Sequence, residues 1–312
     1  MIKNMYILHY KNIMNNKPYA TLFISVLSVS FAAIFIVSCS AHPLSIAFYR
    51  LLFTTLIIIP FVIFNKKTKK ELMNLSCITL IIMAGIGLIL AAHFSLWITS
   101  LKFTSVASSV ILVAAHPFLV GPISHYLFKE KLSILNITGI ILSIFGVIIL
   151  VYGNYGLSSI ALDSLEGNIL ALLGGVAAGF YILGGRKMRK KISVTSYAFV
   201  VYGVSTIALL LICLIFNAPI YNISIRDYQI ILLMAIISGI FGHTLYNWSL
   251  KYIQTSIVSV VLLGEPLAST LFAYAIPWIH QVPSEYTIIG GAIIIIGIYM
   301  TARKQTKLEK YH

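Results

Sequence analysis

Residues 249–266, SLKYIQTSIVSVVLLGEP, are a second version of residues 100–117, SLKFTSVASSVILVAAHP. The two segments align without a gap at an offset of 149 residues, and each begins with Ser-Leu-Lys and an aromatic residue. Each ends with an ionisable residue and a proline, which are His116 and Pro117 in the first segment and Glu265 and Pro266 in the second. This correspondence predicts a chain made of two copies of one unit.

The composition indicates that the chain folds in a bilayer. It has 312 residues, of which 59% are hydrophobic and 10% charged, whereas about a quarter of the residues of a typical soluble domain are charged. A run of roughly 18 or more apolar residues predicts one membrane-spanning helix. Short connections separate ten such runs: 19–39, 43–64, 75–100, 104–128, 134–152, 167–185, 195–216, 228–250, 253–278 and 286–302. We therefore predict an all-α integral membrane protein with ten transmembrane helices.

The repeat extends over both halves of the chain. Gly139 and Gly146 correspond to Gly290 and Gly297 at an offset of 151, so the second copy has gained two residues near 276–282. Each copy holds five spans, an odd number, so the second copy must be inverted relative to the first. Inverted repeats are typical of secondary transporters, whose substrate site lies near the bilayer midplane. The predicted organisation is a basic cytoplasmic segment (1–17), two five-helix repeats (18–153 and 167–302), an extracytoplasmic linker (154–166) and a basic tail (303–312).

The positive charge follows the predicted topology and does not indicate binding to nucleic acid. The net charge is +14, and nineteen of the 22 Lys and Arg residues fall on one predicted side, with Lys102 and Arg226 on the other and Arg50 within a span. This positive-inside bias predicts a multi-pass protein of the cell inner or plasma membrane with both termini in the cytoplasm. We expect the N-terminal segment to lie along the inner membrane surface or to form a basic tail.

His116 and Glu265 are the strongest candidates for a functional site. Each lies about 12 residues into its span, or roughly 18 Å deep at 1.5 Å per residue. Pro117 and Pro266 each remove a backbone donor and predict a helix break at that depth. An ionisable residue near the bilayer centre costs roughly 2.5–3.5 kcal/mol on insertion scales. The costly residue and the broken helix coincide twice, which predicts a substrate site at the midplane.

Other polar residues within spans extend this candidate site. Arg50 would bind an anionic substrate group or pair with Glu265; alternatively, it would snorkel to the outer headgroups. His93 and Trp97 share one helix face, as do His243, Tyr246 and Asn247. The alternatives are helix–helix hydrogen bonds for the histidines and a place in the interfacial aromatic belt for Trp97. We predict that the third, fourth, eighth and ninth spans line the cavity and that the second contributes Arg50.

Two apolar segments, 134–150 and 287–300, carry no charge and predict helices for packing or for contact within a homodimer. Small residues at 174–179 (GGVAAG) and at Gly139 and Ser143 favour close helix packing. The three cysteines, Cys39, Cys77 and Cys213, lack paired spacing, so we expect neither disulfides nor a metal site. We expect no cofactor.

The order of several sequence strings resembles the drug/metabolite transporter superfamily, in particular its EamA-type branch with ten helices. These strings are HPLSIAFYR (42–50), HFSLWITSLKFTSVASSVILVAAHP (93–117), FKEKLS (128–133), GNILALLGGVAAGFYILGGRKMR (167–189) and GHTLYNWSLKYIQTSIVSVVLLGEP (242–266). The resemblance covers essentially the whole chain beyond residue 18. It implies movement of a small molecule, most often efflux of a metabolite or drug, by alternating access around a central cavity. Glu130 stands where the family has a glutamate after the fourth span, whereas the second copy has His280 and Gln281 there.

Other functional classes have weaker support in the sequence. It contains no Walker loop, no HExxH and no GxSxG, so neither ATP-driven transport through this chain nor a familiar hydrolase is indicated. An acid–base pair alone is a weak indication of an intramembrane enzyme. A facilitative uniporter or channel remains the alternative to a gated carrier. The expected partners are the lipid bilayer and a small solute, such as an amino acid, an organic ion or an amphipathic toxic compound. If Glu265 is protonated at this depth, it can also carry a coupling proton.

Overall fold

All regular structure in the described part of the chain is helical, which confirms the predicted fold class. The computed structural model describes residues 2–104, 106–161, 165–277 and 282–303. Its elements in chain order are α1 (Ile2–Ser38), α2 (Pro43–Phe64), α3 (Lys66–Met73), α4 (Cys77–Ser100), α5 (Val106–Val113), α6 (His116–Phe128), α7 (Ile134–Ala161), α8 (Leu165–Arg189), α9 (Val194–Ile215), α10 (Ile225–Met234), η1 (Ala235–Thr244), α11 (Leu245–Ser249), α12 (Thr255–Val261), η2 (Leu262–Gly264), α13 (Glu265–Ala275) and α14 (Glu285–Arg303).

Ten helical stretches of the described chain are long and apolar enough to cross a membrane, as predicted. Seven of them lie in single helices, and three are composite. The fourth span joins α5 to α6, the eighth joins α10, the π-helix η1 and α11, and the ninth joins α12, the short 3-10 helix η2 and α13. A bilayer core of about 30 Å requires roughly 20 residues of helix, and the ten stretches are 19–25 residues long.

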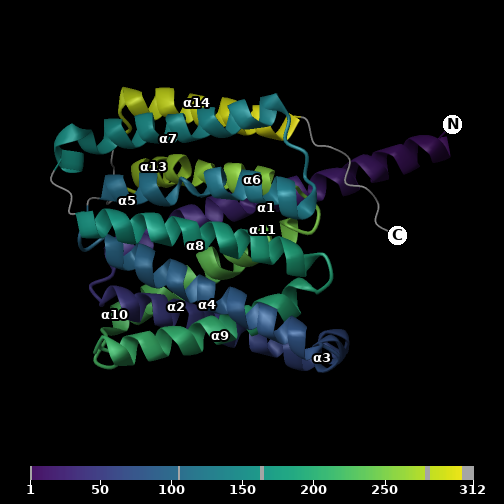
Figure 1. Cartoon of the computed structure of the whole chain (residues 1–312), viewed down its shortest axis with the longest axis horizontal. Coiled ribbons are helices and arrows are strands. Elements are labelled where there is room, and N and C mark those ends of the chain that lie inside the picture. The colour runs from purple at the N-terminus through teal and green to yellow at the C-terminus, as the bar shows by residue number, and fades with distance from the viewer. Residues whose placement is uncertain (1, 105, 162–164, 278–281, 304–312) are drawn as a thin grey trace.

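The spans lie side by side in one bundle (Figure 1). Helices α7 and α14 pair along one edge, with α5, α6 and α13 beneath them, then α1 and α8, and finally α2, α4 and α9 toward the opposite edge. The most extensive contacts join α7 to α14, α4 to α8 and α2 to α9. All three pairs join a helix of the first half of the chain to a helix of the second half, so the halves interleave rather than form separate lobes.

Helices α7 and α14 pack closely because both present small residues. A Cβ atom on Gly139 would lie 2.6 Å from the carbonyl oxygen of Gly297, and one on Gly146 would lie 2.8 Å from that of Gly290. Side chains at these positions would clash with the neighbouring backbone, so glycine allows the helices to approach. The two contacts also show that the helices run antiparallel. This is the close packing that the small-residue pattern predicted.

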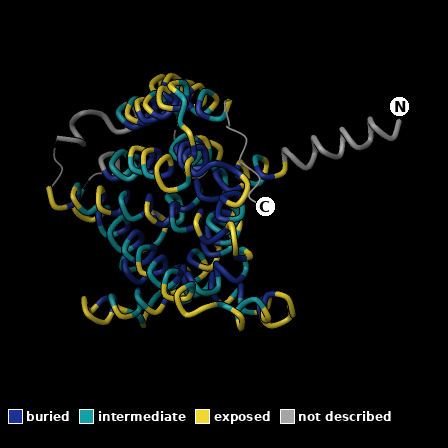
Figure 2. The backbone as a smooth tube through the Cα atoms, turned by 45° about the vertical axis from the view of Figure 1, so that its right-hand side comes forward, coloured by how far each residue is buried: buried dark blue, intermediate teal, exposed yellow. Residues whose placement is uncertain are grey.

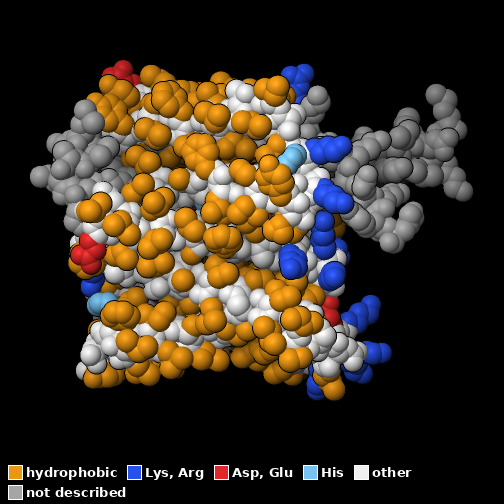
Figure 3. All heavy atoms as spheres, viewed as in Figure 1, with side chains coloured by type: hydrophobic (Ala, Val, Ile, Leu, Met, Phe, Trp, Pro, Cys, Tyr) orange, Lys and Arg blue, Asp and Glu red, His pale blue; other side chains and the backbone are white. Residues whose placement is uncertain are grey.

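The outer surface has the distribution of a membrane protein. Large apolar side chains such as Phe61 (64% exposed) and Ile288 (70% exposed) are exposed. Figure 2 shows exposed residues along the outside of the bundle. Figure 3 shows the apolar surface between the two ends of the helices, with Lys and Arg gathered at one end. This end, which includes Lys66, Lys67, Lys190 and Arg303, is called the basic end below; the other is the distal end.

Some predicted boundaries shift and others cannot be followed. Helix α7 continues to Ala161, into the segment predicted as a linker. Helix α1 begins at Ile2, so the predicted N-terminal basic segment is helical. Residues 162–164, the tail after Arg303, and His280 and Gln281 lie outside the described residues.

Candidate functional site

The fourth and ninth spans are both interrupted, and each resumes at an ionisable residue. Helix α5 ends at Val113 and α6 begins at His116, while α12 ends at Val261 and, after one 3-10 turn, α13 begins at Glu265. Pro117 and Pro266 follow in the first helical turn, where a missing N–H costs no hydrogen bond. Each proline also lacks the donor that would bond to the carbonyl four residues earlier, at Val113 and Leu262.

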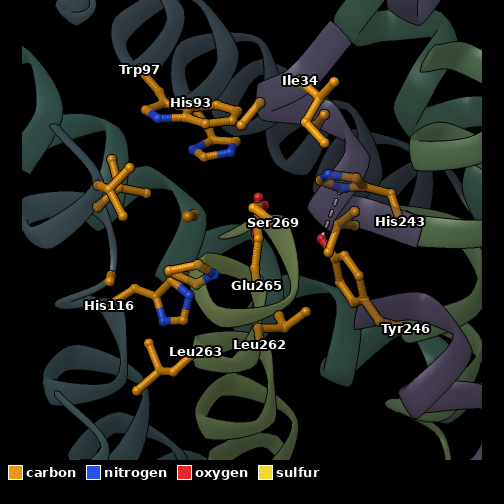
Figure 4. A pocket seen from close by; sticks show the side chains of 18 of the residues that line it. Ile34, His93, Trp97, His116, His243, Tyr246, Leu262, Leu263, Glu265 and Ser269 are labelled. Atoms are coloured by element: carbon orange, nitrogen blue, oxygen red, sulfur yellow. Dashed lines mark hydrogen bonds between the residues drawn. The ribbon is translucent and has the colours of Figure 1, made fainter. Parts of the chain in front are cut away.

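A cavity of about 510 Å³ lies at these interruptions. Seven residues that the sequence analysis proposed for the site line it together: Arg50, His93, Trp97, His116, His243, Tyr246 and Glu265. In Figure 4, Glu265 lies between His116 on one side and His243 and Tyr246 on the other, with His93 and Trp97 across the space. The tertiary structure therefore brings side chains from five spans of both halves to one cavity.

The cavity extends along the spans toward the distal end. Its lining includes Trp97, near the end of α4, and Ser38, an exposed residue that ends α1. At the other extreme it stops at Tyr181 and Tyr246, both buried. In the described part of the chain, the cavity thus reaches the surface at the distal end and is closed toward the basic end.

Arg50 and Glu265 are the charged residues of the cavity lining. The Arg50 guanidinium carbon lies 4.5 Å from the centre of the Phe94 ring, and the side chain is 1% exposed. Its Nη1 has no hydrogen-bond partner among the described residues. Arg50 and Glu265 both line the cavity, yet no ion pair within 4.0 Å joins these two described residues. The two opposite charges therefore share a cavity without direct contact.

The three histidines of the lining each use a ring nitrogen within the protein. His93 Nδ1 lies 2.9 Å from the Gly174 carbonyl oxygen, and its ring stacks on Trp97 at 5.8 Å between centroids. His116 Nδ1 lies 3.0 Å from the Ser259 hydroxyl. His243 Nδ1 lies 3.1 Å from the Tyr246 hydroxyl. The predicted alternative for His93, a hydrogen bond between helices, is therefore present together with its place on the cavity wall.

Asn247 lies beneath the cavity and is absent from its lining, contrary to its proposed role as a lining residue. Its amide Nδ2 donates to the Tyr181 hydroxyl at 2.8 Å and to the His243 carbonyl at 2.6 Å. Asn247 is fully buried. The Nδ2 group therefore links α11 to α8, whereas the amide oxygen Oδ1 has no hydrogen-bond partner among the described residues.

The predicted set of lining helices was incomplete. The first span contributes Val29, Ala33 and Ser38, and the sixth contributes Ala178 and Tyr181. The fifth, predicted only to pack, adds Leu150 and Val151. Most of these residues are small or apolar and carry no signal of function in the sequence. Tyr181 was the one recognisable signal, because it is a polar side chain in the middle of a span.

A second cluster of buried polar groups lies between the cavity and the basic end. We call Glu130, Arg186, Leu250 and Thr255 the clamp. Glu130, which is 2% exposed, accepts hydrogen bonds from the Thr255 N–H at 2.8 Å and the Thr255 hydroxyl at 3.1 Å. Arg186 Nη2 lies 2.9 Å from Glu130 Oε1, and Nη1 donates to the Leu250 carbonyl.

The clamp joins three segments that are distant in sequence. Glu130 follows α6, Arg186 belongs to the last turn of α8, and Thr255 begins α12, whose first N–H groups have no partner within the helix. Arg186 Nη2 and Glu130 Oε1 form a buried ion pair that connects α8 to the end of α6. Burial keeps the pKa of Glu130 above its ordinary value, although Arg186 and Thr255 oppose this shift. The sequence analysis noted Glu130 only through the family resemblance and missed its partners.

Comparison with known proteins agrees with this architecture. Residues 16–152 and 165–303 match the sequence model of the EamA-like transporter family. An uncharacterised transporter of Archaeoglobus fulgidus is 26% identical over 301 residues, which cover 94% of this chain and 99% of that protein. The uncharacterised transporter YyaM of Bacillus subtilis is 23% identical over 275 residues, covering 86% of this chain and 87% of that protein.

A solved crystal structure has the same fold. It superposes with a TM-score of 0.77 at 16% sequence identity and covers 95% of this chain and 99% of its own. At this identity the likeness concerns the arrangement of the helices and not the solute. The two family matches coincide closely with the two five-span halves of the structure.

Proposed function

The chain belongs to the EamA-like transporter family, and from this premise we propose that it is a secondary carrier that exports a small organic solute in exchange for protons. The observation that carries this proposal is the pair of opposite charges, Arg50 and Glu265, that face one cavity where the ninth span is broken. A charge within a span is costly and usually marks a solute or ion pathway.

The two ends of the cavity support alternating access. The described residues leave it open toward Ser38 at the distal end, while Tyr181, Tyr246 and the clamp lie between it and the basic end. A carrier needs a second state in which the basic end opens. Because Glu130 and Arg186 join α6, α8 and α12, separating this pair would free these helices to move apart. A channel needs no such closure, so the clamp favours a gated carrier over a channel-like permease.

An inverted repeat accounts for the way in which the two halves meet. Gly139 contacts Gly297 and Gly146 contacts Gly290, so each glycine meets the counterpart of the other. A two-fold axis in the membrane plane would produce this crossed pairing. The interrupted fourth and ninth spans, with His116 and Glu265 at equivalent positions, support the same relation. In transporters of this type the solute site lies at the interface of the repeats.

The gathering of Lys and Arg at one end supports a cytoplasmic basic end in a cell inner or plasma membrane. Reporter fusions test this orientation: those at Lys66 and Arg189 are expected inside, and one at Ile160 outside. A reporter exposed on the outer face at Arg189 would reverse the direction proposed for the cavity. The homodimer through α7 and α14 stays a prediction, and it would use their outer faces because their glycine faces already pack on each other.

Glu265 is the residue in this cavity that can couple protons to solute. A carboxylate can bind either a proton or a positively charged group of a solute, but not both at once. Proton binding from the distal end would release the solute there, and loss of the proton on the other side would restore the binding site. The facilitative alternative differs in that transport would not depend on protonation.

The test uses the purified full-length protein in liposomes loaded with a defined mixture of amino acids, organic acids and amines. Efflux is quantified by mass spectrometry after acidification of the outside. We expect Glu265→Gln to lose pH-driven efflux by about tenfold or more while retaining exchange of solute for solute. Glu285→Gln, at an exposed glutamate at the start of α14, is the matched control and should behave like the wild type. Normal pH-driven efflux by Glu265→Gln would overturn the coupling proposal, and absence of saturation or exchange would favour a channel.

A further inference from the structure

A second hollow of the described chain lies at the basic end, apart from the central cavity. It is an open groove of about 740 Å³, formed by the end of α2, the start of α3 and the start of α9. Its lining consists of Pro60, Phe61, Phe64, Asn65, Lys66, Lys67 and Thr195. None of these residues lines the central cavity, so the groove can hold a ligand of its own.

One part of the groove is aromatic and faces outward. Phe61 is 64% exposed and Phe64 is 83% exposed, and both belong to the last turns of the second span. Neither ring packs against another aromatic ring of the described chain. Because a span of this length crosses the hydrocarbon core, rings at its end lie where the acyl chains of a leaflet meet the headgroups.

The other part of the groove is positively charged. Lys66 and Lys67 are the first two residues of α3, and both are exposed. Neither makes an ion pair with a described residue, and the groove lining contains no carboxylate. The Asn65 side chain already accepts the N–H groups of Lys67 and Thr68, at 3.0 and 3.2 Å. The two ammonium groups, and not the free end of a helix, therefore provide the charge of the groove.

Other basic side chains at this end have partners within the protein. Lys190 Nζ lies 5.7 Å from the centre of the Phe128 ring, and Lys251 Nζ lies 5.9 Å from that of Tyr252. Arg186 pairs with Glu130 in the clamp. Lys66 and Lys67 differ from these residues because they combine unpaired ammonium groups with an apolar groove. Figures 1 and 3 show α3 at the basic end, where Lys and Arg gather.

We propose that this groove binds an anionic glycerophospholipid of the leaflet at the basic end. The phosphate lies at Lys66 and Lys67, the Thr195 hydroxyl donates to a headgroup oxygen, and an acyl chain covers Phe61 and Phe64. Each lysine near a membrane surface attracts anionic lipid, and the aromatic wall requires an apolar partner. A free phosphate would leave the rings uncovered, and an uncharged apolar molecule would leave the lysines unpaired. A lipid satisfies both parts and connects α3 to α9.

The test uses the purified full-length protein in non-ionic detergent micelles, with lipid binding measured by native mass spectrometry. The protein is titrated with dioleoyl phosphatidylglycerol or dioleoyl phosphatidylcholine, which share the acyl chains and the phosphate but differ in net charge. We expect the first phosphatidylglycerol to bind about tenfold or more tightly than phosphatidylcholine. Glycerol phosphate, added as a soluble competitor, should not displace it because it has no acyl chain. Equal binding of the two lipids would overturn the proposal, and displacement by glycerol phosphate would indicate a phosphate site instead.

A matched pair of double variants assigns the binding to the groove. Lys66→Gln with Lys67→Gln should weaken phosphatidylglycerol about tenfold or more. Lys69→Gln with Lys70→Gln is the control, because it removes the same charge from exposed lysines of the same helix that do not line the groove. The control should change the affinity by less than about twofold. Equal losses in the two variants would indicate diffuse attraction to the basic end and overturn the site.

A variant of the aromatic wall tests the place of the acyl chain. Phe64→Ala should weaken both lipids about threefold, since part of a buried apolar contact is lost. Phe216→Ala is its control, at a 70% exposed phenylalanine that follows α9 at the distal end. This control should leave the first binding step unchanged. Unchanged binding by Phe64→Ala would overturn the acyl-chain contact, and with it the assignment of the groove to a lipid.

Discussion

The cavity and the clamp each contain a buried arginine and a glutamate. The two side chains are in contact in the clamp and apart in the cavity. Arg50 and Arg186 are both fully buried, and each has a glutamate in the same region. In the clamp, Arg186 and Glu130 are 2.9 Å apart, and Thr255 completes the bonding of the carboxylate. In the cavity, Arg50 and Glu265 make no such contact. The difference indicates that burial alone does not identify a functional charge. What identifies it is burial beside an empty space without a protein partner.

The interrupted fourth and ninth spans show the same contrast at one pair of equivalent residues, His116 and Glu265. His116 begins α6 and contacts the Ser259 hydroxyl of the other half at 3.0 Å. Glu265 begins α13 and has no hydrogen bond to a described residue. The position that was repeated has therefore diverged, with a partnered histidine in one copy and an unpartnered carboxylate in the other.

The largest expected effect is on stability at the clamp. Arg186→Met leaves Glu130 as a buried unpaired charge, which typically costs about 3–5 kcal/mol. Arg50→Met removes no protein partner and replaces a buried cation by an apolar chain, so the free energy of unfolding should change by less than about 1 kcal/mol. Denaturant unfolding of both variants in mixed micelles measures the difference. Equal losses would remove the distinction between the two arginines.

A double variant sharpens the comparison by measuring the clamp pair itself. Adding Glu130→Gln to Arg186→Met removes the stranded charge, so about 1–3 kcal/mol of the lost stability should return, within the range of coupling energies for residues in contact. The same cycle at Arg50 and Glu265 should give a smaller coupling energy, because these two side chains make no contact. A larger coupling energy in the cavity would show that the two charges pair directly in the protein as it exists in lipid.

A third prediction concerns α7 and α14, where packing without charge holds the halves together. Gly297→Ala would place a Cβ 2.6 Å from the Gly139 carbonyl oxygen, and overpacking of this kind costs about 1–3 kcal/mol. The matched control is Gly203→Ala in α9, because a Cβ there meets nothing within 4 Å. The control should be neutral or slightly stabilising. A thermal unfolding scan in micelles measures both, and a neutral Gly297→Ala would mean that these helices are further apart than the structure has them.

The smallest expected effect is at Glu71, a carboxylate at the basic end that is paired with hydroxyl groups and not with an arginine. It accepts hydrogen bonds from the Ser193 N–H at 2.9 Å and from the hydroxyls of Ser193 and Ser196. Burial raises the pKa of Glu71, but these hydrogen bonds and the charge of Arg189 outweigh burial, so its pKa lies below the ordinary value of 4.5.

A lowered pKa means that Glu71 stabilises the folded state above pH 4.5 and that this contribution disappears as the pH falls through the lower, folded-state pKa. Glu71→Gln should therefore cost at most about 1 kcal/mol at neutral pH and nothing in acid. Melting temperatures of both proteins across this pH range provide the measurement. A difference that persists in acid would mean that the charge is not the cause.

Hydropathy and the repeat determined much of this protein before any contact was known. Local runs of residues indicate the ten spans, the all-helical class, the family resemblance and the depth of His116 and Glu265. An apolar run forms a helix in the bilayer because its backbone polar groups find no other hydrogen-bond partners there. Seven of the eight residues proposed to bind substrate line the cavity.

Tertiary structure alone decided which helix faces meet. In a bilayer, lipid and protein interior are equally apolar, so an apolar sequence does not reveal which of its faces turns inward. For this reason the contributions of the first and sixth spans, the place of Asn247 beneath the cavity and the partners of Glu130 were not predictable. The sequence showed that Arg50 and Arg186 are present, but only three-dimensional contacts, made between residues distant in the chain, decided that Arg186 is paired and Arg50 is not.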